Sequence, residues 1–156
     1  MNYKFIIKGR PITKKNSQIR TKTGVIQSKQ YREYESIAVL QLRAQKSKWR
    51  LKAPIACPVT MSCYYHMPNK RGYPDVIGLL QATADILEKA GVVEDDRLIS
   101  IVGNCYIGRI DKENPCVEIS ISEITDTNWY QYYQDPFCIK KMGNGEYEYL
   151  KEMRGE

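Results

Sequence analysis

This chain of 156 residues contains one histidine, no C-x-x-C pair of cysteines and no long apolar run. We expect the single histidine, His66, to have a core or surface role rather than a catalytic one. Five cysteines are an odd number without a C-x-x-C spacing, which indicates neither a disulfide framework nor a zinc motif. No run approaches the ~20 apolar residues of a membrane-spanning helix, and the N-terminal apolar stretch is too short for a signal peptide. We therefore expect a cytoplasmic protein with reduced cysteines and no membrane partner.

Acidic residues are scarce in the first third of the chain. Residues 1–52 carry 14 Lys and Arg against 2 acidic residues, a charge of +12, whereas residues 53–156 sum to −6. Such a basic segment favours nucleic-acid binding, because neutralising phosphates releases counterions, although a solvated basic face is the alternative. Basic residues of a polar arm and of a later loop are expected to contact DNA phosphates: Arg10, Lys14, Lys15, Arg20, Lys70 and Arg71.

Apolar periodicity predicts four strands and two helices. The strands are expected at 3–9, 59–67, 97–110 and 115–124, and residues 10–24 are expected to form a loop. The apolar face of the first helix, which starts near Ser28, comprises Tyr31, Tyr34, Ile37, Ala38 and Leu42. The second helix starts near Asp75, ends at Gly91 and buries Leu79, Ala82, Ile86, Leu87 and Ala90.

These elements predict an α/β (α+β) fold with a mixed or antiparallel sheet packed with two main helices. No glycine-rich loop follows a strand, which excludes a doubly wound nucleotide-binding fold. Residues 1–124 are expected to form one domain, and residues 125–156 an aromatic C-terminal extension packed on the same domain.

Carboxylates flank the second predicted helix in the stretch PDVIGLLQATADILEKAGVVEDD. Asp75 starts this helix, and Glu94, Asp95 and Asp96 follow its end. If the chain folds back after Gly91, Asp75 and Asp96 share one divalent cation, for which Mg²⁺ or Mn²⁺ has the right preference for oxygen ligands. Such a cation polarises a phosphoryl group and activates water. An acidic triplet is also typical of a solvated turn, and the residues alone leave both interpretations open.

The stretch PDVIGLLQATADILEKAGVVEDDRLI resembles the central signature of the RusA-type Holliday junction resolvases, with its P-D, A-G and D-D pairs. The similarity extends to IKGRPITKKNSQIR and YREYE, and covers about residues 3–122. It implies a homodimeric, magnesium-dependent endodeoxyribonuclease that cuts branched DNA in recombination and repair. By this resemblance Asp75, Asp95 and Asp96 are catalytic and hold the metal. Glu94, which precedes the acidic pair, is a further candidate metal ligand that the resemblance does not imply.

Three positions depart from the pattern of these resolvases. The second aspartate of their D-x-D is Ile77 here, the next asparagine is Gly78, and their catalytic lysine is Gln81. The departures favour a second hypothesis, a DNA-binding protein of this fold that has lost nuclease activity. A third, a dimeric interaction module, rests only on the aromatic stretch at 128–137.

Overall fold

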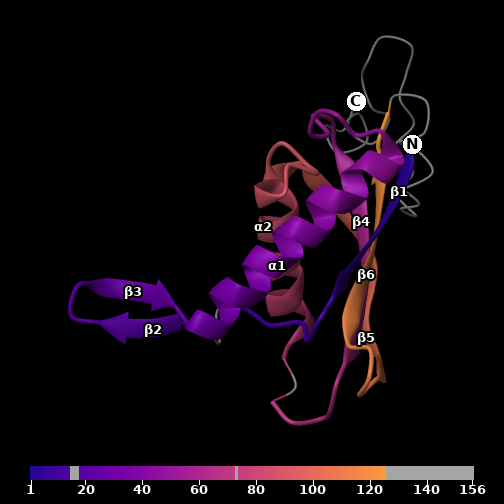
Figure 1. Cartoon of the computed structure of the whole chain (residues 1–156). Coiled ribbons are helices and arrows are strands. Elements are labelled where there is room, and N and C mark those ends of the chain that lie inside the picture. The colour runs from indigo at the N-terminus through magenta and orange to yellow at the C-terminus, as the bar shows by residue number, and fades with distance from the viewer. Residues whose placement is uncertain (15–17, 73, 126–156) are drawn as a thin grey trace, which may run out of the picture. The chain divides into compact units, whose positions relative to one another are not determined.

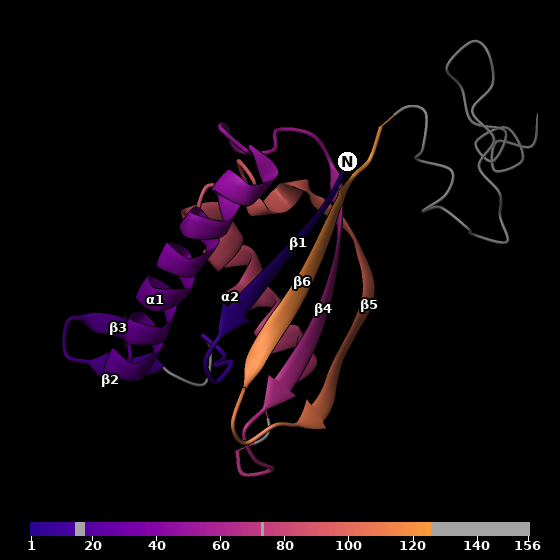
Figure 2. The same ribbon diagram turned by 45° about the vertical axis from the view of Figure 1, so that its right-hand side comes forward.

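Four strands form one mixed sheet in the order β1-β6-β4-β5, and two helices lie on one of its faces (Figure 1; Figure 2). The strands of this sheet are β1 Asn2–Lys8, β4 Val59–Met67, β5 Ile99–Ile110 and β6 Cys116–Glu123, and the helices are α1 Lys29–Lys46 and α2 Val76–Lys89. Strands β4 and β5 are parallel, whereas β6 is antiparallel to β1 and β4. This architecture confirms the predicted α+β fold with a mixed sheet.

The computed structural model describes residues 1–14, 18–72 and 74–125. Met1–Glu123 form a compact unit. Lys15 and almost all of the predicted aromatic extension lie outside the described residues. None of the described helices is both long and apolar enough to cross a membrane.

The core lies between the sheet and the two helices. Strand β4 alternates strictly, with every second side chain fully covered: Val59, Met61, Cys63, Tyr65 and Met67. Alternate strand residues point to opposite faces, so the other β4 side chains, including Tyr64 and His66, lie on the face away from the helices. The sheet therefore presents one buried face and one face that no described helix covers (Figure 2).

Helix α1 is capped by Ser28, whose Oγ accepts the Tyr31 amide at 3.1 Å. The buried positions are Tyr31, Ala38 and Leu42. The prediction that Ile37 lies on the buried stripe is wrong, because its side chain is 55% exposed. Consecutive residues of an α-helix are rotated by about 100° around its axis, so Ile37 faces a different direction from its buried neighbour Ala38.

Residues 10–24 are not a simple loop, because they contribute to a hairpin of β2 Gln18–Thr21 and β3 Gly24–Gln27. The turn depends on Gly24, which has φ +141°, and on the Thr21 hydroxyl, which donates to the Gly24 carbonyl at 2.8 Å. The prediction missed this hairpin because each strand has only 4 residues and β2 is mostly polar. Figure 1 shows the hairpin projecting beside the N-terminus of α1, and both Arg20 and Lys22 on it are exposed.

Candidate functional site

Asp75 is the N-cap of α2, as the sequence predicts. Its Oδ1 accepts the Gly78 amide at 2.6 Å, which fixes the carboxylate over the first helical turn. A Cβ at Gly78 would lie 3.1 Å from Oδ2 of Asp75 and 3.1 Å from Cγ2 of Thr13, so a larger residue there requires its neighbours to move. Ile77, in contrast, is 74% exposed. The first turn of α2 thus offers one oriented carboxylate and one exposed apolar side chain.

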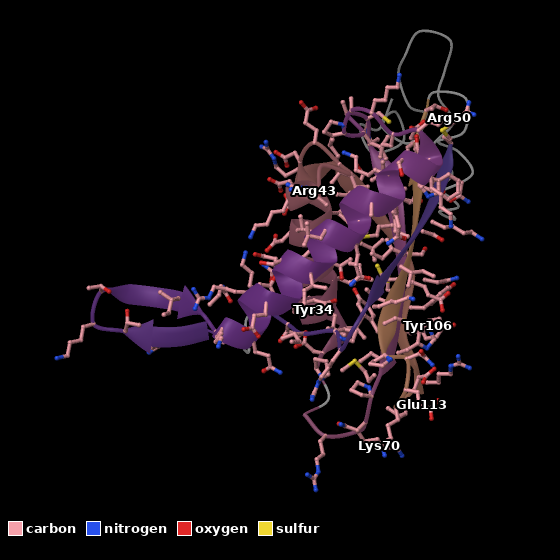
Figure 3. All side chains as sticks on the ribbon, viewed as in Figure 1. Tyr34, Arg43, Arg50, Lys70, Tyr106 and Glu113 are labelled. Carbon is pink, nitrogen blue, oxygen red and sulfur yellow. The ribbon has the colours of Figure 1, made fainter. Side chains whose placement is uncertain are left out.

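Basic side chains gather at this end of α2. Nη2 of Arg10 donates to the Arg71 carbonyl at 3.2 Å, which joins the start of the arm to the loop that leads into α2. Arg10, Lys70 and Arg71 are exposed, and Figure 3 shows Lys70 on this loop, at the end of the sheet where β4 finishes. The N-terminus of a helix also carries partial positive charge. Phosphate binding beside Asp75 is therefore electrostatically favoured.

Lys14 follows this part of the arm and reaches Asp85 of α2, whose side chain is largely covered. Its Nζ lies 2.5 Å from Oδ2 of Asp85. The pKa of Lys14 is raised, chiefly by this hydrogen bond and further by the carboxylates of Glu35 and Asp96. The amine is therefore held in an ion pair, and its predicted phosphate contact would have to compete with that pair. No sequence pattern indicated this contact between residues far apart in the chain.

Asp95 and Asp96 gather with Glu88 around Arg97, whose pKa all three carboxylates raise. Asp95 caps the short 3₁₀ helix η3 Asp96–Leu98 and accepts from Nε and Nη2 of Arg97 at 2.8 and 2.7 Å. This guanidinium lowers the pKa of Asp95 to about 2. The Asp96 amide donates to a carboxylate oxygen of Glu88 at 3.3 Å. Glu94 is exposed.

Helix α2 separates Asp75 from this acidic segment within one chain. Glu88 is thirteen positions after Asp75, a rise of about 20 Å along the helix, and Asp96 lies beside Glu88. Because β5 runs parallel to β4, the chain has to enter β5 at the C-terminal end of α2 and does not return towards Asp75. The expectation that Asp75 and Asp96 share a cation inside one chain is therefore not met.

The candidate carboxylates offer the oxygen ligands that Mg²⁺ prefers. Within one chain, however, these oxygens lie too far apart to bind the same ion. Among the described residues, no three histidine, cysteine or acidic side chains that include Asp75, Glu94, Asp95 or Asp96 approach within 4.8 Å of one another. A single chain therefore supplies these carboxylates in two places, at the two ends of α2.

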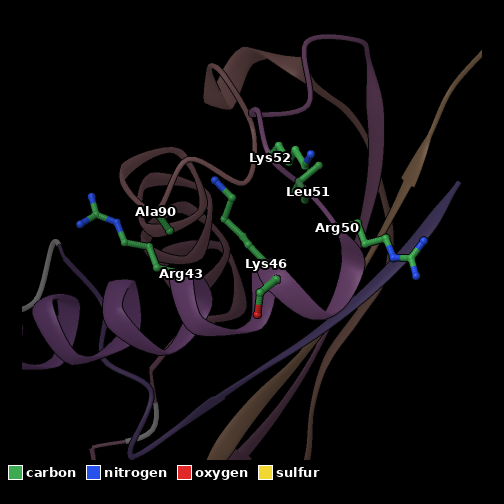
Figure 4. A pocket seen from close by; sticks show the side chains of 7 residues that line it. Arg43, Lys46, Arg50, Leu51, Lys52 and Ala90 are labelled. Carbon is green, nitrogen blue, oxygen red and sulfur yellow. The ribbon is translucent and has the colours of Figure 1, made fainter.

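A second basic surface lies at the C-terminal end of α1. Arg43 donates to the Lys89 carbonyl at 3.1 Å and Lys46 to the Gly91 carbonyl at 2.6 Å, so these cations satisfy carbonyls at the end of α2. Together with Arg50 and Lys52 they border an open hollow (Figure 4). Arg50 points away from the other basic groups in Figure 4. The sequence predictions did not single out this surface.

Comparison with known proteins identifies the family of this chain. Residues 8–122 match the family model described as endodeoxyribonuclease RusA. The chain belongs to the RusA family. It is 31% identical over 112 residues to the crossover junction endodeoxyribonuclease RusA of Aquifex aeolicus (strain VF5), an alignment that covers 71% of this chain and 83% of the relative.

The RusA match spans both ends of α2, including Asp75, Asp95 and Asp96. Its range also contains the three departures from the RusA signature. Ile77 and Gln81 are exposed, and Gln81 precedes Asp85 by four positions, which places the two side chains one turn apart on the same face. The Lys14 amine on Asp85 is therefore a cation one helical turn from the position at which the signature has lysine.

Proposed function

We propose that this chain is a magnesium-dependent, homodimeric endodeoxyribonuclease that cuts branched DNA, such as Holliday junctions, during recombination or repair in the cytoplasm. The observation that carries the proposal is the RusA match over residues 8–122, which contains Asp75 together with Asp95 and Asp96. The exposed cations beside Asp75 support it, because a branched DNA substrate presents closely spaced phosphates.

Residues at the N-terminal end of α2 bind and orient the phosphate in this proposal. Arg10, Lys70 and Arg71 supply positive charge, and the helix terminus adds backbone dipoles aimed at an anion. The Lys14 amine lies one turn further along α2 than Gln81, and it replaces the missing cation only when phosphate competes with its ion pair to Asp85. The carboxylates of Asp75 and Asp96 are the proposed magnesium ligands, with Asp95 or Glu94 assisting. Bound Mg²⁺ supplies Lewis-acid activation of the phosphodiester and of water.

A homodimer resolves the separation of the two carboxylates. A two-fold axis perpendicular to α2 makes the two copies of this helix antiparallel, so that Asp75 of one copy meets Asp96 of the other. Two identical composite sites then arise, one for each of two symmetric cuts. The antiparallel arrangement also aligns the helix dipoles favourably. In this dimer neither protomer holds a complete site alone.

Mixed dimers test the composite site. Asp75→Asn and Asp96→Asn should each abolish cleavage of a synthetic four-way junction. When the two variants are co-expressed with different tags and the heterodimer is purified, one of its two sites contains both native carboxylates. We expect this heterodimer to nick one strand per junction. If the wild-type protein cuts and the heterodimer does not, each site is built from one chain and the composite arrangement is wrong.

The second candidate function is DNA binding without cleavage. The specific observation in its favour is Ile77, an exposed apolar side chain at a position where the RusA signature has a metal-binding aspartate. Gln81 also favours this function, because it replaces a lysine whose charge could stabilise the transition state of phosphoryl transfer. This protein would bind junctions through the same basic residues and leave them uncut with Mg²⁺ or Mn²⁺.

A further inference from the structure

Three side chains of different chemical types meet on the sheet face that lies away from the helices. They are His66 on β4 and Cys116 and Glu118 on β6, and one potential ligand atom from each lies within 4.8 Å of the other two. His66 and Cys116 are direct partners in the β4–β6 register. Glu118 follows Cys116 by two residues and therefore shares its face. Two paired strands of the main sheet position all three groups.

The imidazole of His66 is incompletely satisfied. Its Nε2 lies 2.9 Å from Oε1 of Glu118, whereas Nδ1 is buried and has no hydrogen-bond partner among the described residues. A buried polar atom without a partner costs free energy, so it calls for a ligand or another explanation. Cys116 is a free, half-buried thiol beside it in the register.

The neighbouring strand β5 borders this cluster at Gly108 and Tyr106, whose ring carbon Cε2 would lie 3.3 Å from a Cβ at Gly108. Gly108 on the neighbouring strand β5 carries no side chain, and a Cβ there would approach Cε1 of His66 to 3.7 Å. The nearby Asp111 carboxylate is already engaged, since its Oδ1 accepts the amides of Glu113 and Asn114 at 3.2 and 2.9 Å. Three protein ligands and one position for water are therefore the simplest arrangement.

We propose that His66, Cys116 and Glu118 bind a divalent transition-metal ion of the zinc type. Imidazole nitrogen, thiolate sulfur and carboxylate oxygen are all zinc ligands, and a thiolate disfavours Mg²⁺. Ligand atoms around a tetrahedral zinc are separated by roughly 3.3–3.6 Å, as follows from bond lengths of about 2.0–2.3 Å. The three ligand atoms lie within 4.8 Å of one another and would have to adopt this spacing when the metal binds.

The metal would tie β4 to β6 at the end of the sheet where the loop 111–115 enters β6. This site lies on the opposite face of the sheet from α2 and is independent of the proposed nuclease site. It was hidden in the sequence because His66 and Cys116 are 50 positions apart and follow no known metal spacing. The strand register alone brings them together.

Cobalt binding to the tag-free full-length protein tests the site. We expect one Co²⁺ per chain, with a thiolate-to-cobalt charge-transfer band in the near ultraviolet. The band should disappear in Cys116→Ser and persist in Cys57→Ser, a matched control at another partly buried free cysteine. No band in the wild-type protein, or a band that survives Cys116→Ser, would overturn the proposal.

Zinc affinity gives a second test that does not depend on the cysteine variant. His66 is the only histidine, so a ¹⁵N spectrum of the protein contains one imidazole, whose nitrogen shifts should change on zinc addition and not on magnesium addition. Glu118→Gln removes a ligand whose side chain is 52% exposed, which spares the core. We expect it to weaken zinc binding at least about 10-fold, the lower bound for losing even an outer-shell partner. An unchanged affinity or an unchanged imidazole signal would contradict the site.

Discussion

Asp95 is the residue whose ionisation the structure perturbs most clearly among the candidate acids. Arg97 lowers the pKa of its carboxyl to about 2, from an ordinary value of 3.8. A depressed carboxyl pKa adds stability above the ordinary pKa, and this contribution is lost as the pH falls through about 2. Arg97→Ala should raise the Asp95 pKa from about 2 towards its ordinary value of 3.8, as measured by NMR titration, although the amide of residue 97 still donates to the carboxylate. Arg109→Ala, which removes a cation paired with Asp111, should leave Asp95 unchanged. An Asp95 pKa that stays near 2 without Arg97 would contradict this explanation.

Ile77 is the departure from the RusA signature that substitution can reverse at least cost. Its side chain is 74% exposed in the first turn of α2, where a negative charge interacts favourably with the helix dipole. Ile77→Asp should therefore stabilise the protein by about 0.3–1 kcal/mol at low salt, measured by urea unfolding.

Ile37→Asp is the matched control, because Ile37 is also exposed but lies in the middle of α1. It should bring no such gain. Equal effects at the two positions would mean that the dipole of α2 is not the cause. With a second carboxylate beside Asp75, Mg²⁺ should also raise the melting temperature of Ile77→Asp more than that of the wild-type protein.

At the scale of elements, the β2–β3 hairpin is the part of the basic arm that we did not predict from the sequence. Arg20 and Lys22 are exposed on it, whereas Lys14 is paired with Asp85. Arg20→Gln with Lys22→Gln should flatten the slope of log affinity against log salt for DNA by about 0.9 for each phosphate that the protein no longer neutralises. Lys14→Gln should change the slope less, because its amine is held by a carboxylate. If only Lys14→Gln changes the slope, the hairpin does not bind DNA.

An element can be predicted from the sequence when neighbouring residues determine it, and not when it depends on pairing with a distant segment. Asp75 as a cap and β4 as a strand follow from neighbouring residues, and both predictions are confirmed. The direction of β5 depends on pairing with β4 across the whole crossover, so the sequence did not reveal that Asp96 lies at the far end of α2. The cluster of His66 with Cys116 likewise depends on strand register, which a single sequence does not specify.

At the scale of the whole molecule, ion pairs between distant segments join the basic third of the chain to the acidic remainder. Lys14 with Asp85 and Lys89 with Glu35 both connect segments more than fifty residues apart. The first pair follows the charge asymmetry of the sequence, whereas the second runs against it, because Glu35 lies in the basic third and Lys89 in the remainder. Exposed basic side chains remain around the N-terminus of α2 and on the hairpin, and this arrangement supports a DNA-binding surface beside Asp75.

Cleavage of a synthetic four-way junction tests the central claim most directly. Wild-type protein, Asp75→Asn and Asp96→Asn are each incubated with the junction and with linear duplex of the same sequence, with and without Mg²⁺, and binding is measured in parallel. We expect the wild-type protein to cut the junction at symmetric positions only when Mg²⁺ is present, to spare the duplex, and both variants to bind without cutting. A wild-type protein that binds the junction and leaves it intact with either Mg²⁺ or Mn²⁺ would contradict the nuclease assignment.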